Sequence, residues 1–217
     1  MNVDEHPYEP HFNRRWIRAT PAPPGFGVTL EFAPLWKVDR LEALYTIRNS
    51  TNKTYAVFNH VSRGDLHDVD FVQIDFTGTA LLLSKQVVPW PEMFLSHNDP
   101  PAQSLIEPGG SLSERIVVPL PAVVNNWVRQ TWLEAESMHK KKYRAEALRR
   151  TRRVTLIIGI IEVRPGIRVI EHVRAPGIFS VEGADLAAEQ IALTKTVLLA
   201  DPIELLDYDA QPREAPP

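Results

Sequence analysis

The chain has 217 residues, no cysteine and a formal net charge of −3, and its composition of 44% hydrophobic and 24% charged residues is that of a globular protein. Without cysteine it has no disulfide, thiolate zinc site, iron–sulfur cluster or thiol nucleophile. Its small net charge gives no overall attraction to nucleic acid.

The first residues are acidic and polar and show no secretory signal. The longest apolar run, residues 156–161, is too short to span a membrane. We therefore expect a cytoplasmic protein without a transmembrane segment.

Proline divides the chain into elements. The 19 prolines gather in clusters, and because proline cannot donate to a β-ladder, these clusters mark the edges of strands. On this basis we expect an extended N-terminal arm over residues 1–26, a single domain over 27–209 and a flexible tail over 210–217. The first strand of the domain is predicted at residues 28–33.

Residues 41–61 have the pattern of a β-hairpin. Apolar and polar residues alternate along 41–48, six turn-type residues follow at 49–54, and a β-rich run at 55–58 supplies the return strand. The pattern predicts two neighbouring antiparallel strands.

A second segment, residues 153–173, resembles residues 41–61 when the chain is shifted by 112 positions without a gap. In this alignment the predicted strands and turns of the two segments coincide, and both segments end in His-Val. Only four of the 21 aligned positions are identical. Two explanations stay open: an internal duplication of one hairpin, or the shared composition of β-strands.

Three further strands are predicted before residue 121. Residues 69–76 and 112–120 each show one apolar face, and residues 79–84 are apolar on both faces, as in a central strand. The spacing of strands and Pro-Gly turns is common in sandwiches, so we expect an antiparallel β-sandwich, immunoglobulin-like in its general architecture. The Cys…Trp…Cys spacing of true immunoglobulin domains is absent, and no family is assigned.

Residues 122–150 are predicted to form one long helix inserted into the sandwich. Apolar residues recur at three- and four-residue spacing, and neither glycine nor proline interrupts the segment. Beyond it we expect strands at 154–163, 167–173, 178–181 and 191–199, with one helical turn at 185–189.

Aromatic side chains supply the first candidate binding surface. Trp90, Met93 and Phe94 lie in a long proline-rich loop, and Trp127 and Trp132 lie on the predicted helix. Loops on a rigid sandwich carry binding, and aromatic side chains supply contact energy. The alternative is that these side chains cap the core.

A basic segment is the second candidate. Eight of the 24 basic residues fall within the fourteen positions 140–153. Such a segment can neutralise phosphates or attract anionic lipid, but it also suits the solvated C-terminal end of a helix. The patch that we define comprises Lys140, Lys141, Lys142, Arg144, Arg149 and Arg150.

The segment after the predicted hairpin holds candidate metal ligands, namely His60, His67, Asp68 and Asp70. Two imidazoles and a carboxylate form a known ligand set. Their spacing matches no defined metal motif, and Asp and His are ordinary loop residues. We therefore predict no metal site, and keep these four residues as ligands for an alternative function.

The sequence favours a non-enzymatic protein-interaction or structural module without a cofactor. It holds no nucleophile elbow and no Gly-rich phosphate loop, so no catalytic residue is predicted. We expect a protein partner, or a second copy of the chain, to bind through the aromatic loop and the helical insertion. Two alternatives stay open: a metal-dependent hydrolase or oxygenase at the loop of residues 60–70, and a protein that binds nucleic acid or an anionic membrane through the basic segment.

Overall fold

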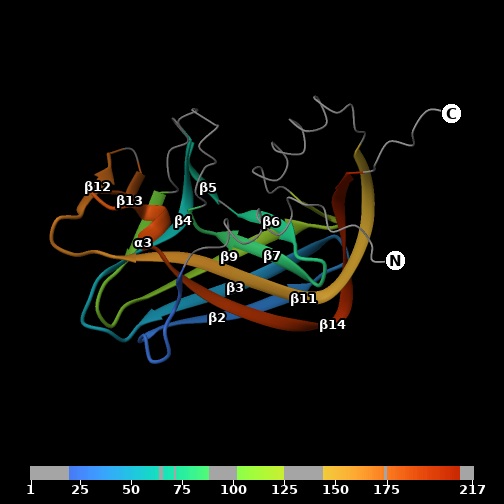
Figure 1. Cartoon of the computed structure of the whole chain (residues 1–217), viewed down its shortest axis with the longest axis horizontal. Coiled ribbons are helices and arrows are strands. Elements are labelled where there is room, and N and C mark those ends of the chain that lie inside the picture. The colour runs from blue at the N-terminus through green and yellow to red at the C-terminus, as the bar shows by residue number, and fades with distance from the viewer. Residues whose placement is uncertain are drawn as a thin grey trace, which may run out of the picture.

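The computed structural model of this chain describes residues 20–63, 66–70, 72–87, 102–124, 144–173 and 175–210; for residues 61–63, 66–70, 73, 144–147, 187 and 207–210 it describes the backbone alone. Over these ranges the chain is mainly β and forms two sheets whose strands are mostly antiparallel (Figure 1). This part of the predicted fold class is confirmed. No helix in the described ranges is long and apolar enough to cross a membrane.

The smaller sheet has three strands in the described residues, in the order β2 (Val28–Trp36), β3 (Arg40–Asn49) and β9 (Ser111–Pro119). The central strand β3 buries every second residue, as its sequence pattern predicts. Leu41, Ala43, Tyr45 and Ile47 therefore point into the core, while the residues between them point outward.

The larger sheet has 11 strands in the same described ranges and is built around β11 (Arg144–Glu162). On one edge β11 pairs antiparallel with β14 (Ile191–Ala210). On the other edge it pairs first with β7 (Ala80–Lys85), in parallel, and then with β4 (Tyr55–Arg63). The remaining strands are β1 (Thr20–Pro21), β5 (Leu66–Asp70), β6 (Gln73–Phe76), β8 (Ala102–Ile106), β10 (Ala122–Val123), β12 (Arg168–His172) and β13 (Ala175–Glu182).

One apolar core lies between the two sheets. Inward-facing residues of β3 and β9 share a buried cluster with Leu81 and Leu83 of β7 and with Leu156 and Ile158 of β11. Full burial of one such side chain is worth about 1.5–3 kcal/mol. Strand β7 is buried along its whole length, as predicted for a strand apolar on both faces.

The predicted hairpin over residues 41–61 is wrong, because its two strands belong to different sheets. β3 pairs with β2 and β9, whereas β4 pairs with β5, β8 and β11. The connection between them passes from one sheet to the other, and the side chain of Asn49 fixes it. Its Nδ2 donates to the carbonyls of Lys53 (2.6 Å), Ile106 (3.2 Å) and Glu107 (3.1 Å).

The second segment of the suggested repeat is not a hairpin either. β11 continues into β12 through a turn at Arg164, but β12 pairs with β13 and not with β11. The two segments also occupy different places, since β3 is the centre of the small sheet and β11 the centre of the large one. The structure therefore gives no matching hairpins to support an internal duplication, and the common composition of β-strands is sufficient for the likeness.

The predicted long helix over residues 122–150 is not supported by the described residues at either end. Ala122–Val123 form β10, and Arg144–Arg150 form the first part of β11, whose register with β14 begins at Arg144 and Ala210. A continuous ladder satisfies the backbone there and overrides local helix propensity. Residues 125–143 lie outside the described part of the chain.

Several other predicted elements agree with the structure. Residues 112–120 lie on β9, and the turn expected at residues 185–189 is helix α3 (Leu186–Glu189), where the Asp185 side chain accepts a hydrogen bond from the Ala188 amide as the N-cap. The single strand expected at 69–76 is instead two strands, β5 and β6, in different places in the large sheet.

Candidate functional site

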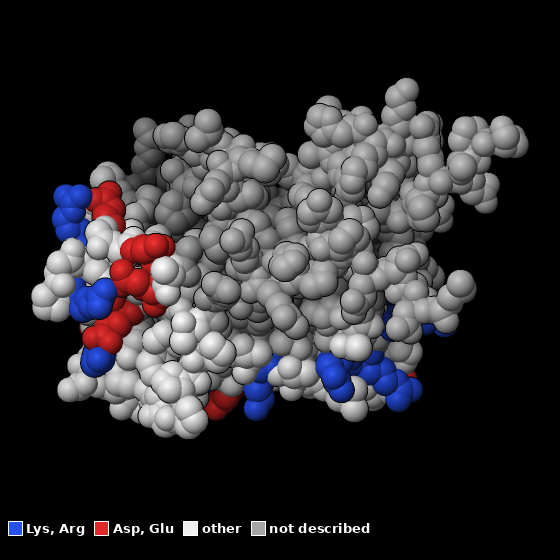
Figure 2. All heavy atoms as spheres, viewed as in Figure 1, with Lys and Arg blue, Asp and Glu red and all other residues white. Residues whose placement is uncertain are grey.

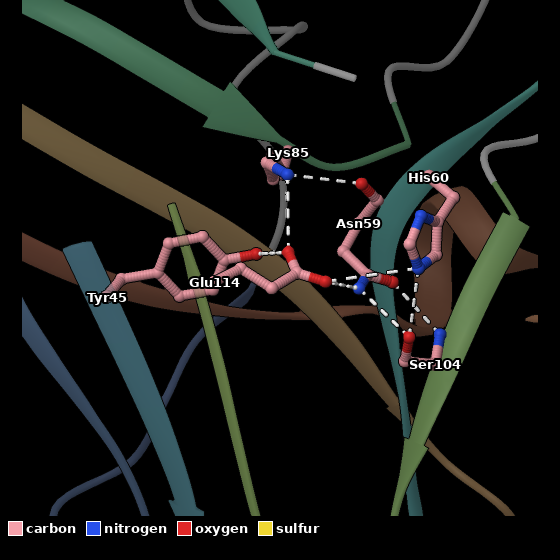
Figure 3. A network of polar contacts seen from close by, with 6 residues as sticks. All are labelled: Tyr45, Asn59, His60, Lys85, Ser104 and Glu114. Carbon is pink, nitrogen blue, oxygen red and sulfur yellow. Dashed lines mark hydrogen bonds and ion pairs between the residues drawn. The ribbon is translucent and has the colours of Figure 1, made fainter. Parts of the chain in front are cut away.

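A network of polar side chains lies between the two sheets, inside the otherwise apolar core (Figure 3). It draws on strands of both sheets: β3 and β9 from the small one, and β4, β7 and β8 from the large one. We call it the Glu114 network; its members are Tyr45, Asn59, His60, Lys85, Ser104 and Glu114.

Strand alternation places the two charged members inward. On β9 the residues at positions 116 and 118 are buried, so Glu114 has the same orientation. On β7 Lys85 follows Leu81 and Leu83 at two-residue spacing and therefore faces the small sheet as they do. Its side chain is 0% exposed, against 16% for Glu114.

The Glu114 carboxylate is the centre of the network, and both of its oxygens are occupied. Oε2 accepts hydrogen bonds from the Tyr45 hydroxyl and from Lys85 Nζ, the latter at 3.4 Å. Oε1 accepts a hydrogen bond from Asn59 Nδ2. A buried carboxylate needs such partners to stay charged, because burial without them costs several kcal/mol.

Lys85 is also compensated by neutral groups. Its ammonium donates to the Asn59 carbonyl at 3.1 Å and lies 5.5 Å from the centre of the Tyr45 ring, within the range of a cation–π interaction. The partners of the buried ammonium therefore include one carboxylate, one carbonyl and one ring face.

His60 and Ser104 form the edge of the network. His60 Nε2 lies 3.0 Å from Ser104 Oγ and 3.9 Å from Glu114 Oε1. In a serine triad the carboxylate holds the opposite ring nitrogen, Nδ1, so that Nε2 is left to take the serine proton. Here the serine and the carboxylate share one nitrogen. Glu114 therefore does not take the place of the triad carboxylate, and the network links strands of the two sheets.

A second feature is an open groove at the surface, where ends and connections of both sheets meet. It encloses about 350 Å³. We call it the Trp36 groove; its lining residues are Trp36, Val38, Leu120, Pro121, Arg150, Pro202 and Glu204. The side of the groove formed by the large sheet carries an ion pair, in which Arg150 donates to Glu204 at 2.6 Å.

Trp36, the last residue of β2, and Val38, in the turn from β2 to β3, line this groove. Trp36 is 41% exposed and Val38 is 88% exposed. The turn is closed by backbone hydrogen bonds between Lys37 and Arg40, and its Asp39 carbonyl accepts from the Leu120 amide at 2.9 Å. The exposed aromatic side chain therefore lies at the end of a strand, directly before a fixed turn.

Three cations around Glu42 hold the same turn. Lys37, Arg40 and Arg115 each approach its carboxylate within 2.7 Å. Hydrogen bonds from Lys37 and Arg40, together with the charge of Arg115, lower the pKa of Glu42 to about 2. At neutral pH Glu42 is therefore ionised and ties the turn to β9.

This cluster predicts a dependence of stability on pH. Because the folded pKa of about 2 lies below the free value of about 4.3, the cluster stabilises the fold above about pH 5, and this contribution is lost as pH falls toward 2. We expect Glu42→Gln to lower the denaturant midpoint at about pH 7 and to change it much less at about pH 2. Glu31→Gln, at an exposed pair, is the control. An equal effect of Glu42→Gln at both pH values would contradict the prediction.

Of the residues predicted from the sequence, the structure brings His60 into the Glu114 network and Arg150 into the Trp36 groove. Arg144 and Arg149 lie on β11, so the basic patch in this part is on a strand and not on a helix end. The predicted residues outside the described part of the chain are Trp90, Met93, Phe94, Trp127, Trp132, Lys140, Lys141 and Lys142.

The metal-site alternative is only partly described. The ladder of β4 and β5 places Asp70 directly opposite His60, but the side chains of His67, Asp68 and Asp70 are outside the described part. Among the side chains that are described, no group of three or more potential ligands comes together.

Sequence reasoning missed the centre of the network. Glu114 interrupts an otherwise apolar inward row on β9, and Lys85 ends a strand that is buried on both faces. A charged residue at an inward position of a strand is the signal that could have found both.

Comparison with known proteins identifies no relative, since no family model, no curated protein and no solved structure matches this chain. The function must be argued from the two features above.

Proposed function

We propose that this protein is a non-enzymatic interaction module that binds a protein partner through the Trp36 groove. In this proposal the two sheets act as an immunoglobulin-like sandwich in the general sense, a rigid support whose strand ends and turns carry the binding residues. The Glu114 network supports the rigidity of this support, because its hydrogen bonds join strands of both sheets.

The observation that carries the proposal is the exposed Trp36 side chain at the end of β2, directly before a fixed turn and beside Pro121 and the Arg150–Glu204 pair. Tryptophan and arginine dominate the residues that supply most of the energy in protein interfaces. A turn held by Glu42 and by the Leu120 amide loses little conformational entropy when a partner binds.

Other sequence predictions remain proposals beside this one. One is that Trp90, Met93 and Phe94 also contact the protein partner. Another is that the protein is cytoplasmic. The metal-dependent alternative at His60 and Asp70 requires ligands whose side chains are not described, and no observation favours it over binding.

Site-specific photo-crosslinking tests the proposal. A benzophenone side chain at Val38, which lines the groove and is 88% exposed, is expected to capture one dominant protein in cells that produce the full chain. The same probe at Val173, which is 97% exposed on another part of the surface, serves as the control.

Trp36→Ser should reduce the yield of the Val38 adduct at least tenfold, because loss of a central aromatic anchor costs about 2 kcal/mol or more. A thermal unfolding curve of the variant would show that the fold is retained. The proposal fails if the adducts at Val38 and Val173 are the same, or if Trp36→Ser leaves the Val38 adduct unchanged.

A further inference from the structure

Two arginines beside the Trp36 groove have no carboxylate partner in the described part of the chain. Arg152 and Arg153 are exposed on β11, just after Arg150, which lines the groove. Other exposed arginines of the described ranges are paired, as Arg164 is with Glu189 and Arg168 with Glu182. Two unpaired cations side by side are a departure from that pattern.

A β-bulge sets the position of these arginines. The register of β11 and β14 shifts between Thr151 and Arg153. The buried Thr151 hydroxyl fixes the bulge, since it donates to the Thr79 carbonyl at 2.8 Å and accepts from the Arg153 amide at 3.0 Å. Bulges redirect side chains and are frequent next to functional sites. The register shift therefore breaks the inward–outward alternation of β11, so that Thr151 is buried while Arg152 and Arg153 are both exposed.

The surface around them is cationic and partly apolar. In Figure 2 one group of Lys and Arg side chains, with little acidic surface beside it, lies at the lower right, where β11 and β14 curve in Figure 1, whereas the Lys and Arg side chains at the left lie among acidic ones. Leu198, which lies opposite Arg153 in the ladder, is 71% exposed. Two exposed arginines and an exposed leucine thus lie on the two strands, β11 and β14, that line one side of the groove.

We propose that the Trp36 groove and the adjoining arginines bind an acidic, extended segment of a partner protein. This inference rests on the proposed function and names the partner's chemistry. An aliphatic, proline or aromatic side chain of the segment enters the groove against Trp36. Acidic residues a few positions away pair with Arg152 and Arg153, because a carboxylate accepts two parallel hydrogen bonds from a guanidinium.

The charges favour a protein segment over nucleic acid. A nucleic-acid surface needs a stripe of cations that follows the phosphates. Here the groove itself holds Glu204, which neutralises Arg150 and would repel a phosphate backbone, and the whole chain carries a net charge of −3. Two unpaired arginines next to an apolar groove suit a short acidic segment with one apolar anchor.

A random dodecapeptide library displayed on phage, selected against the full chain, tests this proposal. The enriched peptides should contain more Asp and Glu than the unselected library, together with at least one aromatic, proline or aliphatic residue. The selected peptides, made synthetically with a fluorescent label, should bind more weakly as salt is raised, because exposed charge pairs are screened.

Two matched variants locate the binding. The charge reversal R152E/R153E should weaken the selected peptides at least tenfold. The reversal R164E/R168E, an equal change in charge at the start of β12, should leave the affinity within about twofold, because distant exposed charges are screened by salt. Circular dichroism would confirm that both variants are folded.

Three results would overturn the proposal, each at a different step. Peptides that depend on Trp36 but are not acidic, and that ignore R152E/R153E, would refute the acidic partner and leave the proposed function standing. Peptides that ignore Trp36→Ser, or a selection that enriches no peptide, would refute the proposed function as well. Tighter binding of a labelled 20-base-pair DNA duplex than of any selected peptide, lost in R152E/R153E, would assign the arginines to nucleic acid.

Discussion

Glu114→Gln is expected to lower the free energy of unfolding by about 3–5 kcal/mol, which is the usual cost of removing one partner of a buried ion pair. The variant leaves the fully buried Lys85 ammonium without the carboxylate that lies 3.4 Å away. It also replaces a charged acceptor of the Tyr45 hydroxyl and of the Asn59 amide with a neutral one. The loss of stability is large because Lys85 is fully buried, so water cannot solvate its ammonium in place of the lost carboxylate.

A double-mutant cycle separates the pair from its surroundings. Lys85→Met removes the buried charge and keeps an apolar stem of similar length, so the double variant K85M/E114Q should be more stable than the sum of the two single effects predicts, by more than about 1 kcal/mol. Urea unfolding followed by tryptophan fluorescence measures all three variants. Additive effects would mean that Lys85 and Glu114 do not interact.

Glu107→Gln is the control for this series. The Glu107 carboxylate is exposed and accepts one hydrogen bond from the Thr54 hydroxyl, at 2.6 Å. Its replacement should cost no more than about 1 kcal/mol, because exposed polar contacts contribute little. A loss of 3 kcal/mol or more at Glu107 would show that the method reports a general effect of removing carboxylates.

Comparing the predicted and the observed strand β3 shows how far the sequence predicts this fold. Its alternation correctly assigned the buried face, because the two-residue period of a strand is a local property. Its partner strand was wrong, because the turn residues 49–54 suit a hairpin and a crossing between sheets equally well. What selects the crossing is the Asn49 side chain, which binds carbonyls of the turn after β8, more than fifty residues away in sequence.

The Trp36 groove could not be predicted for a related reason. Its seven lining residues come from five places: strand β2, the turn after β2, the connection that precedes β10, strand β11 and strand β14. No sequence window contains more than a few of them, and Arg150 was placed at the end of a helix by a pattern that the ladder with β14 overrides. Glu114, in contrast, was within reach of the sequence, since an apolar inward row that includes one glutamate is visible on β9 alone.

Gly159→Ala is expected to destabilise the protein by about 1–3 kcal/mol through overpacking, and by about a further 1 kcal/mol for each hydrogen bond that it disrupts. A Cβ atom at Gly159 would lie 2.5 Å from Gln190 Oε1 and 3.0 Å from a ring carbon of Phe58. Both neighbours are buried and cannot move into solvent.

The Gln190 side chain makes two hydrogen bonds that the added methyl group would disturb. Its Oε1 accepts from the Val87 amide at 3.0 Å, and its Nε2 donates to the Val87 carbonyl. This pair of bonds holds the chain directly after β7, where Lys85 enters the Glu114 network. Displacing Gln190 therefore loosens the end of the strand that carries the buried cation.

Two measurements test this account of Gly159. The Val87 amide should exchange with solvent at least tenfold faster in Gly159→Ala, and the effect of Gly159→Ala on urea unfolding should shrink in a Gln190→Ala background, because the clash is already removed. Thr155→Ala, on the same strand but at an exposed contact with Thr196, should cost less than about 1 kcal/mol. An unchanged effect of Gly159→Ala in both backgrounds would show that Gln190 is not the group it displaces, and would assign the strain to Phe58 and Gln86 instead.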